Sequence, residues 1–119
     1  MPSATGVSSI VVSNHGGRQL DGAPATIDQL PGIAALVDGQ IPVLLDGGVR
    51  RGADVVKALA RGATAVGVGR PVMWGLAAGG QDGVRHVLEI FRSELDHTLA
   101  LCGASGVSHL DRYLVLKVP

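Results

Sequence analysis

Three short apolar runs alternate with longer amphipathic stretches along the chain. The runs cover residues 9–12, 41–45 and 63–68, are rich in β-branched side chains, and each leads into a turn that contains glycine. Apolar runs of roughly four to eight residues bounded by turn residues are typical of buried strands. The pattern therefore predicts three strands.

Helical periodicity fills the intervals between these runs. Residues 26–37 carry apolar side chains three or four positions apart, with Thr26 as a predicted N-cap and Pro31 as an interruption, so two short helices explain the pattern as well as one. Residues 52–60 repeat the pattern and stop before Gly62, which suits a C-cap. We predict further helices over about 71–78, about 81–102 and around 108–115, the first of them opened by a proline.

The order of these elements predicts an α/β fold with a parallel sheet and right-handed crossover connections. In such sheets helices cover both faces, so we expect the strands to be buried on both sides. A closed barrel of this type needs eight βα units and about 250 residues, whereas only three units are present here. The chain is therefore expected to be a fragment, to pair with a missing segment or a second copy, or to form a small open sheet.

Composition narrows the classes of protein. Hydrophobic residues make up 46% and charged residues 17% of the 119 residues, which indicates a core-forming chain. The formal net charge is zero, so we expect no nucleic-acid partner. No apolar run reaches the ~20 residues of a membrane span, and the first nine residues do not resemble a signal peptide. These features predict a cytoplasmic protein.

Several single residues are predicted to be structural. The only cysteine, Cys102, lies in an apolar context and is expected to be a small buried hydrophobe. Trp74 and Phe91 are expected in the core. No metal site is expected, because the remaining histidines have no ligand spacing with Cys102 or with one another: His86, His97 and His109.

Residues 13–21 follow the first predicted strand and read Ser-Asn-His-Gly-Gly-Arg-Gln-Leu-Asp. Histidine suits proton transfer near neutral pH, so His15 is a candidate general base. Three positions later, Arg18 offers a planar two-point clamp for a carboxylate. Because ligands bind at the carboxyl ends of parallel strands, both side chains are well placed for one site. A solvated turn remains the alternative for this pair taken alone.

Two further strand ends carry glycine-rich motifs. Residues 46–52 read Asp-Gly-Gly-Val-Arg-Arg-Gly, where backbone amides can wrap an anion, Arg50 adds charge and Asp46 can accept bonds from sugar hydroxyls. Gly69-Arg70-Pro71 follows the third strand in the same way. Two adjacent loops of this kind predict a phosphate site, with ordinary βα turns as the alternative.

Taken together and in this order, the three motifs resemble the FMN-dependent α-hydroxy-acid dehydrogenases, a family that includes lactate oxidase, glycolate oxidase and mandelate dehydrogenase. The resemblance covers about residues 6–113. It implies a TIM (β/α)8 barrel, of which this chain corresponds to units six to eight plus C-terminal helices, so that residues 1–119 form a partial domain. His15 is similar to the family's base and Arg18 to its substrate-carboxylate ligand. The implied FMN contacts are Asp46, Gly47, Gly48, Val49, Arg50, Gly69 and Arg70.

The activity implied by the resemblance is oxidation of a small (S)-2-hydroxy acid, such as lactate, glycolate or mandelate, to the 2-oxo acid, with hydride passing to FMN. The family also uses a lysine, tyrosines and an aspartate from earlier barrel segments that this chain lacks, which predicts that the chain alone is incomplete. Two alternatives stay open: a non-catalytic remnant that binds FMN or phosphate, and another phosphate-binding TIM-barrel enzyme.

Overall fold

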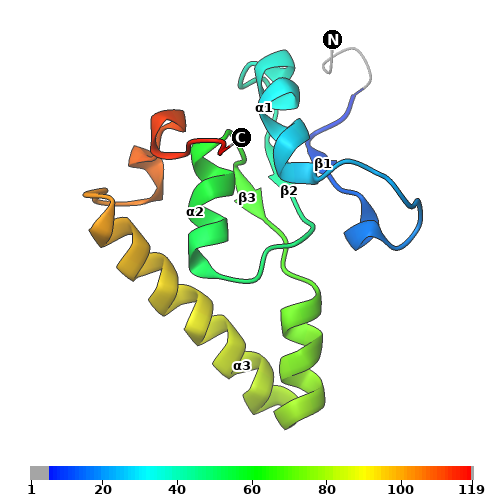
Figure 1. Ribbon diagram of the computed structural model, residues 1–119, viewed down its shortest axis with the longest axis vertical. Coiled ribbons are helices and arrows are strands. Elements are labelled where there is room, and N and C mark those ends of the chain that lie inside the picture. The colour runs from blue at the N-terminus through cyan, green and yellow to red at the C-terminus, as the bar shows by residue number, and fades with distance from the viewer. Residues whose placement is uncertain (1–5, 119) are drawn as a thin grey trace.

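Three parallel strands and three helices alternate along the chain in the computed structural model, which describes residues 6–118 (Figure 1). Part of the segment in which no signal peptide is expected, residues 1–5, lies outside the described residues. The elements are β1 (Ile10–Val12), α1 (Thr26–Val37), β2 (Val43–Leu45), α2 (Gly52–Ala60), β3 (Ala65–Val66) and α3 (Arg70–Leu101). Three 3₁₀ turns add to them: His15–Gly17, Val107–His109 and Arg112–Leu114.

The sheet has the order β1-β2-β3, and all its pairs are parallel, as predicted. Val12 pairs with Leu45, and Leu45 with Val66, so these side chains form one row across the sheet. Val12 and Leu45 are buried and belong to the core cluster, which also contains Leu30 and Val37 of α1. The helices therefore cover the face of the sheet that carries this row.

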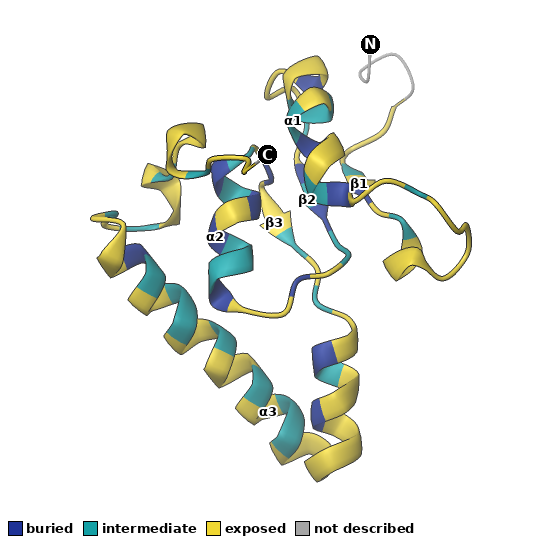
Figure 2. Ribbon diagram, viewed as in Figure 1, coloured by how far each residue is buried: buried dark blue, intermediate teal, exposed yellow. Residues whose placement is uncertain are grey.

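The opposite face of the sheet is open, which corrects the expectation that the strands are buried on both sides. Val11, Leu44 and Ala65 are paired across the three strands and form the row on this face. Val11 is 58% exposed, and Ala65 is also exposed. Among the described residues, no element packs over this apolar row, because the three helices available lie on the other side or beyond the sheet (Figures 1 and 2).

Helix α1 is a single helix that continues through Pro31, so the alternative of two short helices is wrong. Proline removes one backbone hydrogen bond, but the face carrying Leu30 and Val37 is buried against the sheet, and this packing offsets that loss. The predicted N-cap is also wrong. Ala25 occupies that position, and Thr26 instead directs its hydroxyl to the carbonyl oxygen of Asp46, at 2.6 Å.

Helix α3 consists of two arms that diverge from a sharp bend (Figure 1). The bend lies at Gly79 and Gly80, which have non-helical backbone angles, and it confirms the predicted break between residues 78 and 81. The arms touch through glycines: a Cβ atom added to Gly75 would lie 2.7 Å from the carbonyl oxygen of Gly83. The long arm then returns beside α2, where Leu99 is buried.

The C-terminal segment differs from prediction. Instead of a helix around residues 108–115, it forms two separate 3₁₀ turns, and Lys117 then pairs with Asp28 of α1 at 3.3 Å. Cys102 is exposed, so its assignment as a buried hydrophobe is wrong. Trp74 is 56% exposed and likewise not a core residue, whereas Phe91 packs against the core as expected. Within residues 6–118, no helix is both long and apolar enough to cross a membrane.

Candidate functional site

The carboxyl ends of the three strands surround one cavity of about 310 Å³. Segments after β1, β2 and β3 all contribute to its wall, as expected for a parallel sheet. Every residue that the sequence singled out for a site lines this cavity: His15, Arg18, Asp46, Gly47, Gly48, Val49, Arg50, Gly69 and Arg70. Gly16, Gly67, Pro71 and Met73 also line it. The first three lie in the strand-end segments that the sequence indicated, whereas Met73 was not expected at the site.

The loop after β1 holds His15 in an unusual backbone conformation. Its φ of 53° is left-handed, which costs an L-residue about 1 kcal/mol or more. Hydrogen bonds on either side support this turn: the Ser13 hydroxyl accepts from the His15 amide at 3.2 Å, and the Asn14 side chain accepts from the Gly16 amide at 3.0 Å. The imidazole is exposed at the cavity, where it can meet a ligand.

The loop after β2 begins with an aspartate that lacks a partner. The Asp46 amide donates to the Val12 carbonyl oxygen at 3.2 Å and so continues the hydrogen bonding between β1 and β2. The buried Oδ1 atom of its side chain has no hydrogen-bond partner. A buried unpaired carboxylate oxygen is costly, so this atom requires a donor from outside the described residues. Gly47 and Gly48 follow with φ of 93° and 77°, which turns the chain back toward α2.

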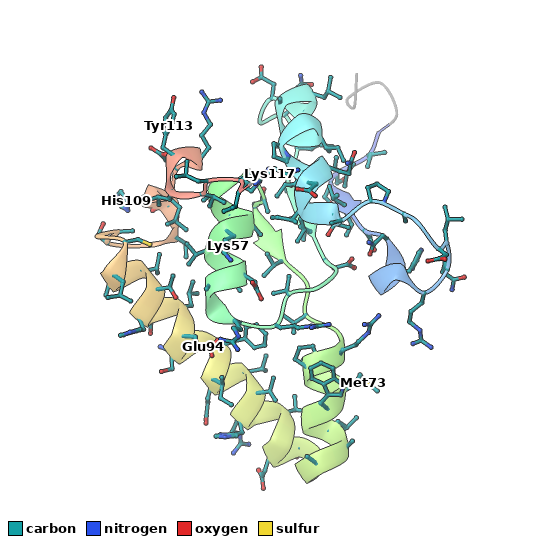
Figure 3. All side chains as sticks on the ribbon, in the orientation of Figure 1. Lys57, Met73, Glu94, His109, Tyr113 and Lys117 are labelled. Atoms are coloured by element: carbon teal, nitrogen blue, oxygen red, sulfur yellow. The ribbon has the colours of Figure 1, made fainter. Side chains whose placement is uncertain are left out.

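The amides at the start of α2 are already occupied. The Asp54 carboxylate accepts from the Arg50 and Arg51 amides, each at 3.0 Å. The Glu94 carboxylate, on the long arm of α3, accepts from the Gly52 amide at 2.7 Å (Figure 3). These bonds engage the last three amides of the loop, whereas the Gly-Gly turn that was expected to wrap an anion lies before them, at Gly47 and Gly48 on the cavity wall. An anion at this loop would meet the turn before Arg50 and the guanidinium groups instead.

Arg70 connects the third strand end to the first. It begins α3 at the cavity wall, and its guanidinium donates to the Gly16 carbonyl oxygen in the loop that carries His15. A guanidinium has five N–H donors, so this bond leaves others for a ligand. Arg70 and Arg50 thus line the cavity from two loops, and both can bind an anionic group.

The site contains the donors and acceptors for a ligand that is both phosphorylated and hydroxylated. Two guanidiniums suit the phosphate, and the unpaired oxygen of Asp46 suits a hydroxyl donor. A metal centre is not indicated: no group of three or more histidine, cysteine or acidic residues within the described part of the chain is placed to hold an ion.

Comparison with known proteins identifies similar sequences. The family described as FMN-dependent dehydrogenase matches residues 3–117. An L-lactate oxidase from a Nostoc species is 59% identical over 106 residues, which are 89% of this chain and 29% of that protein. 2-Hydroxyacid oxidase 1 of Mus musculus is 58% identical over 96% of this chain and 31% of its own length. Pre-mycofactocin synthase of Mycobacterium tuberculosis is 57% identical, covering 88% of this chain and 26% of that protein.

Solved structures show the same local architecture. Mandelate oxidase with benzoyl-formic acid aligns with a TM-score of 0.89 and 54% identity, over 93% of this chain and 33% of that one. A mandelate oxidase variant with a monooxide FMN adduct gives the same TM-score and identity, over 93% of this chain and 35% of that one. The chain therefore spans about a third of the length of the proteins it matches.

Proposed function

The chain belongs to the FMN-dependent dehydrogenase family, and on that premise we propose that it forms the cofactor-phosphate side and the acid–base side of a flavoprotein site. The reaction is oxidation of a small (S)-2-hydroxy acid to the corresponding 2-oxo acid. The observation that carries the proposal is the single cavity onto which His15, Arg18 and both glycine-rich loops open.

The residues of the cavity fit FMN. Arg50 and Arg70 would hold the phosphate, and the turn through Gly47 and Gly48 would approach it closely, because glycine has no side chain to stand in the way. A hydroxyl of the ribityl chain would supply the donor that the buried Asp46 Oδ1 atom lacks. FMN, when bound, supplies the two-electron acceptor that no side chain provides.

His15 and Arg18 would act on the substrate. Arg18 binds the carboxylate through two parallel N–H donors and so orients the neighbouring carbon. The His15 imidazole would take the proton of the 2-hydroxyl group. FMN, when bound, would supply the acceptor for the hydrogen on the same carbon and its electron pair, so that the substrate becomes the 2-oxo acid.

Other parts of the site would come from outside this chain. We propose that the chain corresponds to units six to eight of a TIM barrel and that the remaining units supply the flavin-ring and substrate side-chain contacts. The relatives support this division, since a hydroxyacid oxidase and a pre-mycofactocin synthase are almost equally similar to the chain. Substrate choice among lactate, glycolate and mandelate would therefore depend on the other units.

The alternative is a remnant that binds FMN or phosphate without turnover. The family match removes the other alternative, a phosphate-binding barrel of a different family. A cytoplasmic location remains a prediction, as does a homo-oligomer; some relatives, from Oryza sativa and Arabidopsis thaliana, are named as peroxisomal oxidases.

Titration of the purified chain with FMN, followed by flavin fluorescence and absorbance, tests the proposal. We expect binding that is weakened by Arg50→Ala but not by Arg85→Ala, an exposed arginine on α3 that does not line the cavity. Anaerobic addition of lactate, glycolate or mandelate would then bleach the flavin in an active site, and His15→Ala would abolish bleaching. Bound flavin that no hydroxy acid reduces, even when the remaining barrel units are supplied, would support the remnant, and no FMN binding at millimolar concentration would refute both.

A further inference from the structure

Two polar side chains from different segments converge on Gly47. Asn14 follows β1 and precedes His15, whereas Thr26 is the first residue of α1. A Cβ atom added to Gly47 would lie 3.1 Å from the Asn14 Oδ1 atom and 3.2 Å from the Thr26 Oγ1 atom. Only the bare backbone of a glycine lets both side chains come this close to the turn.

Thr26 fixes the peptide that enters this turn. Its side chain is buried, and its hydroxyl donates to the Asp46 carbonyl oxygen at 2.6 Å. The next residue, Gly47, has a φ of 93°, and a glycine tolerates many other backbone angles. The hydroxyl therefore selects one orientation of the Asp46–Gly47 peptide, and with it the direction of the loop that leads to Arg50.

Asn14 fixes the loop of His15 in the same region. Its Oδ1 atom accepts from the Gly16 amide at 3.0 Å, and its Nδ2 atom donates to the Pro24 carbonyl oxygen at 3.3 Å. These two bonds join the beginning of the loop to its end, just before α1. They also support the left-handed turn at His15, which is unfavourable by itself.

We propose that Asn14 and Thr26 are a pair of positioning residues that clasp the two loops together across Gly47. Neither of them lines the cavity, so each acts through the loops that do. The clasp sets the spacing between the base, His15, and the cofactor loop, residues 46–50. This inference rests on the proposed function for the identity of the ligand that the two loops bind.

A double-mutant cycle on the purified chain tests the clasp, with FMN affinity as the readout. We expect Thr26→Val and Asn14→Ala each to weaken FMN binding about tenfold, the effect of losing one well-formed hydrogen bond. Because both would release the same clasp, the double variant should weaken binding far less than the roughly hundredfold product. Thr26→Ser keeps the hydroxyl donor on a side chain with more rotational freedom. Its FMN affinity should therefore stay within about threefold of that of the unsubstituted chain.

Thr64→Val is the matched control. The Thr64 hydroxyl also bonds to the backbone of β2, where it accepts from the Val43 amide at 3.2 Å. This bond lies at the end of the sheet away from the cavity. The substitution should lower stability without weakening FMN binding. Equal losses of affinity in Thr64→Val and Thr26→Val, or independent effects of Asn14→Ala and Thr26→Val, would overturn the proposal. If Thr26→Val does not fold, an unchanged FMN affinity in Asn14→Ala overturns it instead.

Failure of the proposed function would be recognised separately. If the unsubstituted chain binds no FMN, the clasp is judged by hydrogen exchange of the Gly16 amide in NMR spectra. Thr26 makes no bond to Gly16, yet Thr26→Val should speed this exchange because the neighbouring loop is released. Exchange at the unsubstituted rate would disprove the clasp whatever the chain binds.

Discussion

Gly47 and Gly48 are neighbours in the turn after β2, and both have positive φ. Their surroundings differ, however. A Cβ atom at Gly47 would meet two side-chain oxygens, whereas a Cβ atom at Gly48 would have no heavy atom within 4 Å. The oxygens near Gly47 cannot move freely, since both belong to side chains engaged in hydrogen bonds. At the scale of single residues, the first glycine is needed for space and conformation, the second for conformation only.

This difference predicts unequal costs for the same substitution. Gly48→Ala should lower the free energy of unfolding by about 1 kcal/mol, the usual cost of a left-handed L-residue. Gly47→Ala should cost about 1 to 3 kcal/mol more, because the added methyl group must displace Asn14 and Thr26. Urea unfolding followed by circular dichroism measures both values, and equal costs would show that the close approach is not rigid.

At the scale of elements, α2 and the long arm of α3 pack side by side and approach each other very closely at Gly52. A Cβ atom on Gly52 would lie 2.6 Å from the Glu94 Cβ atom and even closer to the backbone of Leu95. Backbone atoms cannot rotate out of the way, so the helices would have to separate. This would also break the bond from the Gly52 amide to the Glu94 carboxylate.

Gly52→Ala should therefore lower the free energy of unfolding by about 3 kcal/mol, at the upper end of overpacking effects. Gly32→Ala is the control, because Gly32 lies in α1 with open space around it. It should raise stability by up to about 1 kcal/mol, since alanine is the better helix former. Thermal unfolding measures the midpoint temperature of both variants. A shift of both midpoints in the same direction from that of the unsubstituted chain would contradict this interpretation.

Local patterns predicted the elements well, because strands and helices follow from the spacing of apolar residues and from glycine and proline. The sequence also indicated the site, since loops after parallel strands meet at one edge. It could not show that Glu94, which lies 42 residues after Gly52, caps α2, nor that Trp74 and Cys102 are exposed. These facts depend on which elements face one another in the fold. The type of a residue does not determine this.

At the scale of the whole molecule, the apolar row of Val11, Leu44 and Ala65 is uncovered among the described residues, and β1 and β3 are the two edges of the described sheet. Exposed edges and apolar strand faces favour pairing with another chain. We therefore expect the isolated chain to self-associate at high concentration.

Val11→Lys should reduce this association, because a lysine on an edge strand opposes the approach of a second strand. Leu36→Lys is the control: Leu36 is 81% exposed, but it lies on α1 rather than on the sheet. Sedimentation velocity over a range of concentrations compares the three chains. Equal association of the Val11→Lys variant and the unsubstituted chain would show that the open sheet is not the contact.

The charges on the cavity wall shape the electric field that an approaching ligand meets. This wall carries three arginines and one aspartate, while the whole chain has no formal net charge, so the surplus of negative charge lies elsewhere. The cavity wall is therefore locally positive. An approaching anion would be attracted and oriented without any overall charge on the protein, and added salt would weaken that attraction over distances of about 10 Å. The rate of FMN association, measured by stopped-flow fluorescence, should accordingly fall as ionic strength rises.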